Sequence, residues 1–446
     1  MKRLVLLTIA LSACAGCLRP VADFRDTIAD AKAAVFPSLV YVRVITEGRS
    51  EGRMENFQAS GSGVIISEDG ELLTNHHVID RASRIRCQLP DGMAWEAKVV
   101  GKDKDLDIAL LKLEVPEGTR FPAAVLSTRR MEVGEVVLAM GAPWGMARTV
   151  SMGIVSCNDR YLEKCGDYTL WYQTDAAIAP GNSGGPLVDT RGEVVGLNAR
   201  GNLYGGQAFA IPSPLILELL PNLRAHGDAH WAWFGINWQP LRDFERDATF
   251  DAADGVIVAG TDPQSPARAA GLLPNDRVIA IGGVPVTATF REDIPAINRE
   301  LARREWERPV AFAYVRDGAT NSVEIAASRK GAVEGREREF RRWGFTAKDI
   351  NRFDVPELWF HAQDGGVFVT SVAWDGNADN AGFKRKDIIR SVGGRQVGSV
   401  KDLEGCYDEA MSNLATRVQT GVEVLRRGEK VRLVLNYRTD PDKEEN

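Results

Sequence analysis

The chain has 446 residues, 44% of them hydrophobic, which is enough for about three domains with cores of their own. It carries 55 Lys and Arg against 61 Asp and Glu, a formal net charge of −6 with no basic block, which argues against nucleic-acid binding. After the first residues, no apolar stretch approaches the roughly 20 residues that a transmembrane helix needs.

Residues 1–17 have the pattern of an export signal. Met1–Arg3 is a short basic start, and Leu4–Leu11 is an apolar segment too short to span a bilayer. The pattern predicts a lipoprotein signal that is cleaved before Cys14, whose sulfur is then acylated, with Cys17 as an alternative acceptor. An ordinary secretory peptide cut near Cys17 or Leu18 is the other interpretation. We therefore expect an exported protein of the periplasm or cell envelope, held to a membrane surface if Cys14 is acylated.

Residues 18–224 predict a domain made mainly of β-strands. An alanine-rich helix is expected at 23–35 and a closing helix at 214–224, followed by a linker at 225–231. Between the helices, short apolar segments bounded by Gly, Pro, Asp or Asn predict strands at 39–44, 63–66, 97–100, 108–113, 136–140, 153–155, 170–174, 187–188, 194–197 and 208–211. That spacing is typical of two antiparallel barrels.

The heptapeptide Gly-Asn-Ser-Gly-Gly-Pro-Leu at 181–187 is the most specific stretch of the chain. Glycines on both sides of Ser183 let the backbone turn sharply, so that the hydroxyl projects and nearby N–H groups converge. The N–H groups of Gly181 and Ser183 are the natural donors to an oxyanion. The same residue types also make ordinary surface turns, so a catalytic interpretation requires a histidine and an aspartate elsewhere.

Both partners are present upstream. Of the five histidines, only His76 and His77 precede Ser183, and they follow an apolar segment. Asp107 directly precedes the predicted strand at 108–113, where it can be buried and hold a histidine in one tautomer. The order His, Asp, Ser is that of chymotrypsin-type enzymes.

Six segments, in this order, resemble the HtrA/Deg family of serine endoproteases: 60–66, 74–79, 107–112, 140–145, 153–156 and 173–187. The family's histidine immediately precedes a valine, which selects His77 over His76. The resemblance implies a chymotrypsin-like double β-barrel with His77, Asp107 and Ser183 as the catalytic triad.

The resemblance also locates the S1 pocket. The stretch 198–211 is expected to form its wall, which in the family accepts small aliphatic side chains. Ile178, Arg200 and Gln207 are the candidate lining residues. If Arg200 points to solvent the pocket stays apolar, and if it points inward acidic or polar P1 residues become acceptable.

The cysteines and remaining histidines carry weaker signals. Cys157 and Cys165 enclose a short loop, and an exported location permits a disulfide between them. Cys87 and Cys406 lie in different predicted domains and are expected to be buried free thiols. His226 and His230 lie close together in the linker and are expected to be solvated. No Cys/His spacing indicates a metal site, and no cofactor is expected.

An internal repeat follows the linker. The order strand, short helix ending at glycine, strand and Gly-Gly occurs at 255–283 and again at 366–394. This order resembles two PDZ domains, at 232–330 and 338–440. In each copy an aromatic-Gly-apolar turn fits the family's carboxylate-binding loop: Phe234, Gly235 and Ile236, then Trp343, Gly344 and Phe345. N–H groups there could receive a peptide C-terminus. Alternatively, the glycines only start strands, and one or both grooves are closed.

The resemblance implies an ATP-independent serine endopeptidase that degrades misfolded or exposed-terminus proteins, with PDZ domains that recruit peptide C-termini. It also implies a homotrimer or a larger homo-oligomer. The alternative is a peptide-binding chaperone or stress sensor whose protease site is mostly latent. An envelope scaffold with a relic protease domain is disfavoured because all three triad residues are present.

Overall fold

The computed structural model describes residues 23–50, 53–143, 148–162, 165–202, 206–244, 247–262, 265–330, 337–350, 358, 361 and 365–439. The expected signal and Cys14 lie outside these residues. Within them, no helix has both the length and the hydropathy to cross a membrane.

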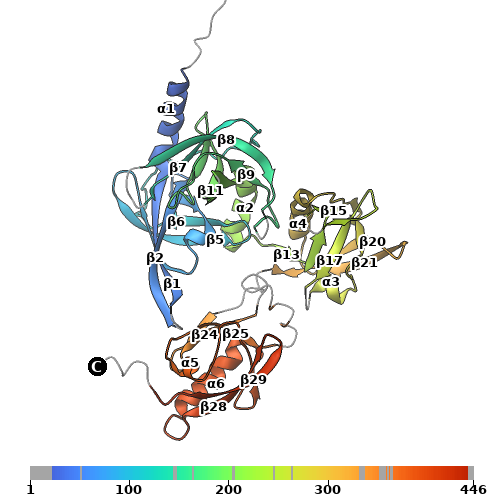
Figure 1. Cartoon of the computed structure of the whole chain (residues 1–446). Coiled ribbons are helices and arrows are strands. Elements are labelled where there is room, and N and C mark those ends of the chain that lie inside the picture. Colours follow the sequence, from blue (N-terminus) through green and yellow to red (C-terminus); the bar gives the residue numbers. More distant parts are fainter. Residues whose placement is uncertain are drawn as a thin grey trace, which may run out of the picture.

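Two closed β-barrels form the N-terminal half of the chain (Figure 1). The first has the order β1-β2-β3-β6-β5-β4, made of β1 (Leu39–Ser50), β2 (Arg53–Ile65), β3 (Glu71–Thr74), β4 (Ala82–Gln88), β5 (Ala94–Asp103) and β6 (Ile108–Leu113). The second has the order β10-β11-β12-β9-β8-β7, made of β7 (Val136–Gly141), β8 (Thr149–Arg160), β9 (Trp171–Thr174), β10 (Pro186–Asp189), β11 (Val194–Asn202) and β12 (Gln207–Pro212). The expected mainly β fold with a chymotrypsin-like double barrel is confirmed.

Strand periodicity explains the barrel interiors. Val40, Val42 and Val44 alternate along β1 and are all buried inside the first barrel. Leu39, on the other face of β1, instead joins a cluster between the barrels that includes Leu138 of β7. The two barrels therefore have separate interiors and share a third apolar layer.

Helices close this half of the chain. α1 (Phe24–Val35) is capped by Asp23, whose carboxylate accepts the N–H of Arg25, and η1 (Phe36–Ser38) leads into β1. α2 (Ser213–His226) packs five buried apolar side chains against the barrels and ends at Gly227, whose φ is +77°. Both expected helices are present, and α2 extends to His226.

The first PDZ fold, called PDZ1 below, follows α2. Its elements are β13 (Ala232–Trp233), β14 (Ile236–Gln239), β15 (Arg242–Asp243), β16 (Ala248–Thr249), β17 (Val256–Thr261), α3 (Pro266–Ala269), β18 (Arg277–Ile281), β19 (Val284–Pro285), η5 (Arg291–Asp293), α4 (Ile294–Ala302), β20 (Pro309–Arg316), β21 (Ala319–Ala326) and β22 (Ser328–Arg329). The main sheet runs β14-β17-β18-β20-β21, so β14 lies at its edge.

The second PDZ fold, PDZ2, has the same succession of two main-sheet strands, a short helix, two strands, a longer helix and two final strands. Its elements are β23 (Glu337–Phe340), β24 (Phe345–Asp349), β25 (Val367–Val372), α5 (Asn377–Asn380), β26 (Ile388–Val392), β27 (Arg395–Gln396), α6 (Val400–Ser412), β28 (Gln419–Arg426) and β29 (Glu429–Asn436). The sheet runs β23-β24-β25-β26-β28-β29, so that β23 covers the edge that is free in PDZ1.

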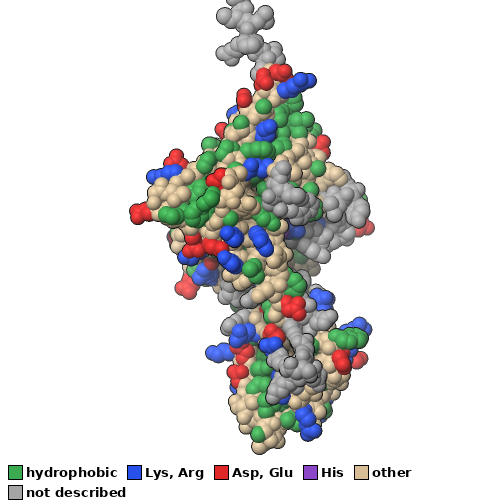
Figure 2. All heavy atoms as spheres, turned by 90° about the vertical axis from the view of Figure 1, so that its left-hand side faces the viewer, with side chains coloured by type: hydrophobic (Ala, Val, Ile, Leu, Met, Phe, Trp, Pro, Cys, Tyr) green, Lys and Arg blue, Asp and Glu red, His purple; other side chains and the backbone are tan. Residues whose placement is uncertain are grey.

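The outer surface carries charges of both signs. On the face shown in Figure 2, acidic and basic side chains are interspersed over the barrels and over PDZ2, with apolar side chains between them. Net charge is therefore spread over this face and not gathered into one large patch of a single sign.

The expected disulfide between Cys157 and Cys165 is wrong for this structure, where both are free thiols. Cys157 lies in β8 opposite Gln173. Cys165 instead packs against the apolar layer between the barrels, and its carbonyl accepts the indole N–H of Trp171 at 3.1 Å. Cys87 and Cys406 are buried free thiols, as predicted.

These environments predict different thiol reactivities. Burial raises the pKa of Cys87 to about 12 and also raises the pKa of Cys406, so little reactive thiolate is available at either residue. Alkylation of the folded protein without reductant, mapped by mass spectrometry, should modify Cys157 and Cys165 well before Cys87 and Cys406. If Cys157 and Cys165 reacted only after a reductant was added, the free-thiol assignment would be refuted.

Candidate functional site

Pairing of β3 with β6 brings His77 to Asp107. The strands are antiparallel with Thr74 opposite Ala109, so the residues after β3 lie beside those before β6. His77 is in the short helix η2 (His76–Val78), and its Nδ1 lies 2.7 Å from Oδ2 of Asp107. The imidazole is half exposed, with 45% of its side-chain surface accessible, whereas Asp107 retains only 6%.

All three oxygen atoms of Asp107 form hydrogen bonds with residues 75–77. Its Oδ1 accepts the backbone N–H of His77 at 2.8 Å. Its carbonyl accepts the N–H of His76 at 3.1 Å and the side-chain amide of Asn75 at 3.0 Å. Asp107 adopts a φ of +57°, a conformation that non-glycine residues seldom take. Such a backbone persists where surrounding contacts fix it, and these hydrogen bonds do so.

Ser62 of β2 anchors the loop that carries Ser183. Its N–H donates to the carbonyl of Ser183 at 2.8 Å, and its hydroxyl donates to the carbonyl of Gly181 at 2.6 Å. The same hydroxyl accepts the N–H of Ala142 from the second barrel at 2.8 Å. Ser62 thus fixes the carbonyl groups of Gly181 and Ser183, which precede and follow the N–H of Ser183 along the chain.

The close contact between the barrels requires glycine beside the serine. At Gly184 the φ is +82°, and a Cβ atom would lie 2.2 Å from the carbonyl oxygen of Ser62. It would also lie 2.3 Å from the hydroxyl of Thr74. Both contacts are too short for any side chain, so only glycine fits here.

The N–H groups of Gly181 and Ser183 donate no hydrogen bond within the described part of the chain. The neighbouring amides differ, since Gly184 donates to the carbonyl of Asn198 and Gly185 to that of Asn182. Two donors without an internal partner therefore lie beside the serine hydroxyl, as an oxyanion site requires.

The serine hydroxyl is not bonded to the histidine. Oγ of Ser183 donates to the carbonyl of Ala199 at 3.2 Å. Among the described residues no hydrogen bond joins this hydroxyl to His77. The structure brings the histidine and aspartate into direct contact, and leaves the serine to rotate toward them.

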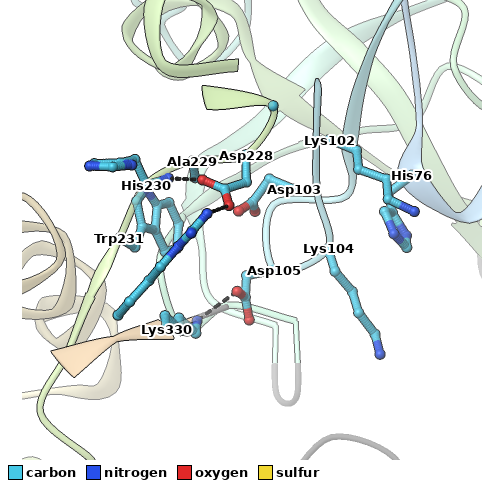
Figure 3. Close-up of a pocket in the computed structure, with 12 residues that line it drawn as sticks. His76, Lys102, Asp103, Lys104, Asp105, Asp228, Ala229, His230, Trp231 and Lys330 are labelled. Carbon is cyan, nitrogen blue, oxygen red and sulfur yellow. Dashed lines mark hydrogen bonds and ion pairs between the residues drawn. The ribbon is translucent and has the colours of Figure 1, made fainter. Parts of the chain in front are cut away.

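His76, the neighbouring histidine, lines a pocket away from the contact between His77 and Asp107. It lines a pocket of about 320 Å³ between the turn at 102–105, the linker at 227–231 and the end of PDZ1 (Figure 3). Its backbone N–H donates to the carbonyl of Asp107, as given above. The two adjacent histidines therefore have different environments.

Lys330 joins PDZ1 to the first barrel in this pocket. Its ammonium lies 2.6 Å from Oδ2 of Asp105 and 3.8 Å from the ring centroid of Tyr168. Burial acts to lower the pKa of Lys330, but Asp105 and Tyr168 outweigh it, and the pKa is raised. The ion pair attaches PDZ1 to the first barrel at Asp105, which precedes Asp107 by two residues in the sequence.

The linker histidines are not both solvated, which corrects the prediction for His230. Its ring is half-buried, stacks on His226 at 3.9 Å between centroids and lies 4.2 Å from the ring of Trp306. Its Nδ1 atom is buried and has no hydrogen-bond partner among the residues that the structure describes. Burial, together with the charge of His226, lowers the pKa of His230, although Asp228 opposes this. Only His226 is exposed.

The three S1 candidates differ in exposure. Ile178 is 9% exposed, and its carbonyl lies 2.4 Å from where a Cβ atom on Gly201 would be. Arg200, opposite Phe209 in the β11–β12 pair, is exposed, and so is Gln207. Ile178 therefore lies against β11, while both polar candidates face outward.

The two candidate carboxylate loops also differ. Phe234 and Ile236 are buried on either side of Gly235, whose N–H donates no hydrogen bond within the described residues. In PDZ2, the N–H of Gly344 donates to the carbonyl of Phe340 at 2.9 Å. Trp343 and Phe345 are buried beside Gly344.

Sequence reasoning did not assign roles to Ser62, Ala199 or Asn198. Ser62 lies in the segment 60–66, whose resemblance to the family was a usable signal. Asn198 pairs with Gly185 through its backbone and donates its side-chain amide to the carbonyl of Pro186. The contacts themselves join residues far apart in the sequence, so the resemblance marked the segment of Ser62 but did not specify its partners.

Known proteins are similar to this chain along most of its length. A trypsin-like peptidase domain model matches residues 61–197, and a PDZ domain model matches residues 233–327 and 356–436. A probable periplasmic serine endoprotease, DegP-like, of Pseudomonas putida is 32% identical over 391 residues, which cover 84% of this chain and 78% of that protein. The periplasmic serine endoprotease DegP of Escherichia coli strain K12 is 31% identical over 384 residues, 84% of this chain and 77% of that protein.

Solved structures agree with these matches. The HtrA-type protease AlgW with a decapeptide aligns with a TM-score of 0.58 and 30% identity, over 68% of this chain and 98% of AlgW. A serine endoprotease from Yersinia pestis aligns with a TM-score of 0.53 and 29% identity, over 68% of this chain and 97% of that protein.

The anchoring role of Ser62 predicts a loss of both activity and stability in Ser62→Ala. The change leaves the N–H of Ala142 and the carbonyl of Gly181 without their partner, which should lower the free energy of unfolding by about 1–3 kcal/mol. Peptidase kcat should fall by about tenfold or more, because the loop N–H groups lose their fixed position. Ser60→Ala, on the same strand, is the matched control. Equal kcat values for the two variants would contradict the anchoring role.

The lowered pKa of His230 predicts a loss of stability in acid. The unfolded chain takes up a proton at the ordinary histidine pKa of about 6.5, whereas the folded chain resists protonation at this residue. The contribution of His230 is therefore present above that pH and decreases as the pH falls toward the folded-state pKa. His230→Asn, which tolerates the φ of +57°, should show a smaller drop in melting temperature from pH 7.5 to 5 than the unmodified protein. An equal drop would refute this role.

Proposed function

The chain belongs to the HtrA/DegP-like family of trypsin-like serine endoproteases, and we propose that Ser183, His77 and Asp107 carry out its peptide-bond hydrolysis. The single observation that best supports this proposal is the 2.7 Å contact between Nδ1 of His77 and Oδ2 of Asp107. That contact leaves Nε2 as the ring nitrogen available to accept a proton.

The reaction proceeds by acyl transfer. Oγ of Ser183 forms a bond to the scissile carbonyl carbon while Nε2 of His77 takes the hydroxyl proton. The imidazolium then gives this proton to the leaving amine as the C–N bond breaks. Asp107, buried and bonded to Nδ1, stabilises the imidazolium and holds the tautomer. Water, activated by the same histidine, hydrolyses the acyl-enzyme and restores the serine.

The N–H groups of Gly181 and Ser183 would hold the oxyanion of each tetrahedral intermediate. Their lack of an internal acceptor and the fixing of the flanking carbonyls by Ser62 support this assignment. Donors that are already oriented need no reorganisation during the reaction, and each is worth about 100-fold or more in rate.

Substrate selection would involve both S1 and PDZ1. Ile178 offers a buried apolar contact, whereas Arg200 and Gln207 are exposed, which supports small aliphatic P1 side chains. Among the described residues β14 pairs only with β17 and the N–H of Gly235 donates no hydrogen bond, and both observations support capture of peptide C-termini by PDZ1. Unfolded or misfolded proteins expose such ends, and we take them as the substrates.

Location and assembly are further parts of the proposal. The relatives named periplasmic, together with the basic and apolar start of the chain, support export to the periplasm. Acylation of Cys14 would anchor the enzyme to a membrane surface. A homotrimer or larger homo-oligomer is the assembly that the family resemblance implies.

A second candidate is a mostly latent enzyme that acts as a peptide-binding chaperone or stress sensor. The observation that favours it is the hydrogen bond from Oγ of Ser183 to the carbonyl of Ala199. While this bond holds, the hydroxyl does not donate to His77. Activation would then require rotation of the Ser183 side chain toward Nε2.

Hydrolysis of unfolded casein at neutral pH, without ATP, separates the two candidates. An active enzyme should cleave casein, Ser183→Ala should reduce cleavage by several orders of magnitude, and Asp107→Asn by about 10⁴-fold. Ser156→Ala, an exposed serine of β8, is the matched control and should retain full activity. Undiminished cleavage by Ser183→Ala would refute the mechanism. Negligible turnover by the unmodified protein, with suppression of aggregation, would instead favour the latent form.

A further inference from the structure

The two PDZ copies use the strand before the carboxylate loop differently. In PDZ1 that strand is β13, which pairs with β22 and leaves the edge of β14 free. In PDZ2 it is β23, which pairs with β24 over the whole length of the strand, from Glu337 opposite Lys348 to Phe340 opposite Phe345. A peptide ligand of a PDZ domain adds to this same edge as an antiparallel strand.

β23 also contacts the helix that forms the other wall of the groove. Arg338 pairs with Glu404 of α6, and the ring of Phe340 lies 5.5 Å from the ring of Tyr407 of α6 in an edge-on arrangement. β23 therefore lies between β24 and α6, which is the position of an added ligand strand.

Phe340 has the contacts that the last residue of a bound peptide would make. It is 1% exposed and packs on the rings of Trp343 and Phe345, at 5.9 and 5.2 Å. Its carbonyl accepts the N–H of Gly344, the donor expected to receive a ligand carboxylate. Both the apolar pocket and the loop donor are occupied by this chain.

The match to the PDZ domain model also distinguishes the two copies, and it does so at the strand before the carboxylate loop. The PDZ model matches the first copy from residue 233, ahead of its loop. It matches the second only from residue 356, after β23 and β24. The second copy thus departs from the family pattern in the segment that closes its groove.

The strand also ties PDZ2 to the first barrel. Oε2 of Glu337 lies 3.1 Å from Nη1 of Arg81, and Oε2 of Glu339 accepts the N–H of Met54 in β2 at 3.1 Å. In Figure 1 the β1–β2 hairpin reaches down to PDZ2 at this point. Displacement of β23 would break both contacts, and Arg81 follows His77 by only four residues.

We propose that β23 is an internal ligand of PDZ2, which closes that groove to free peptide C-termini and leaves PDZ1 as the capturing copy. The proposal rests on the peptide capture proposed above for PDZ domains. A chain end that competes for PDZ2 must displace Glu337–Phe340 and thereby loosen PDZ2 from the first barrel.

Peptide stoichiometry in the full-length protein tests this proposal. The probe is a decapeptide that ends in Glu-Arg-Glu-Phe with a free carboxylate, titrated calorimetrically into the Ser183→Ala protein. One peptide should bind per chain. Arg338→Glu places a second acidic side chain beside Glu404, which should displace β23 and raise the number of bound peptides to two. Phe340→Ser should have the same effect. The double variant Arg338→Glu with Glu404→Arg restores the pair and should return the number to one.

Binding of two peptides per chain to the protein with an unmodified β23 would overturn the proposal. So would binding of one peptide to a folded Arg338→Glu protein in which the amides of β23 are no longer protected from hydrogen exchange. Hydrogen exchange of the amides at 338–340 provides a readout that does not require a variant. These amides should be protected without peptide, and exchange at the rate of an open loop would also overturn the proposal. If no peptide bound at all, capture by PDZ1 would fail, while protection at 338–340 would still decide the role of β23.

Discussion

The contact between the two barrels at Ser62 is the constraint on which the proposed active site depends. His77 and Asp107 belong to the first barrel, and Ser183 belongs to the second. One residue of β2 binds the carbonyls of Gly181 and Ser183 and also the N–H of Ala142. Because Gly184 has no Cβ atom, the loop can lie directly against β2. The distance between nucleophile and base is therefore set by tertiary contacts, while the histidine–aspartate pair is set within one barrel by the register of β3 and β6.

Much of this arrangement could be predicted from the sequence because it depends on short patterns. The strand spacing predicted two barrels, the apolar segment after Asp107 predicted its burial, and the glycines around Ser183 predicted a sharp turn from which the hydroxyl projects. Other features depend on residues far apart in the chain. The ring contact of His230 with Trp306 and the free thiol of Cys165 both follow from packing between segments that no local pattern relates. For the same reason, the role of Ser62 could not be foreseen, although its segment resembled the family.

The two PDZ folds have a similar order of elements but differ at the strand before the carboxylate loop. Both have an aromatic-Gly-apolar turn, and that turn alone left open which of the two grooves binds a peptide. The difference lies in the preceding strand, which pairs with β22 in PDZ1 and with β24 in PDZ2. Each fold also contacts the first barrel, through Lys330 and Asp105 in one case and through Glu337 and Arg81 in the other. Both contacts lie close in sequence to the histidine–aspartate pair, since Asp105 precedes Asp107 by two residues and Arg81 follows His77 by four.

Activation of Ser183 by His77, with the surrounding loop holding the serine in place, can be measured by labelling the intact protein with a fluorophosphonate probe, followed by mass spectrometry of the modified peptide. We expect a single adduct on Ser183, formed at a rate that falls by orders of magnitude in His77→Ala. An adduct elsewhere, or an unchanged rate in His77→Ala, would contradict it.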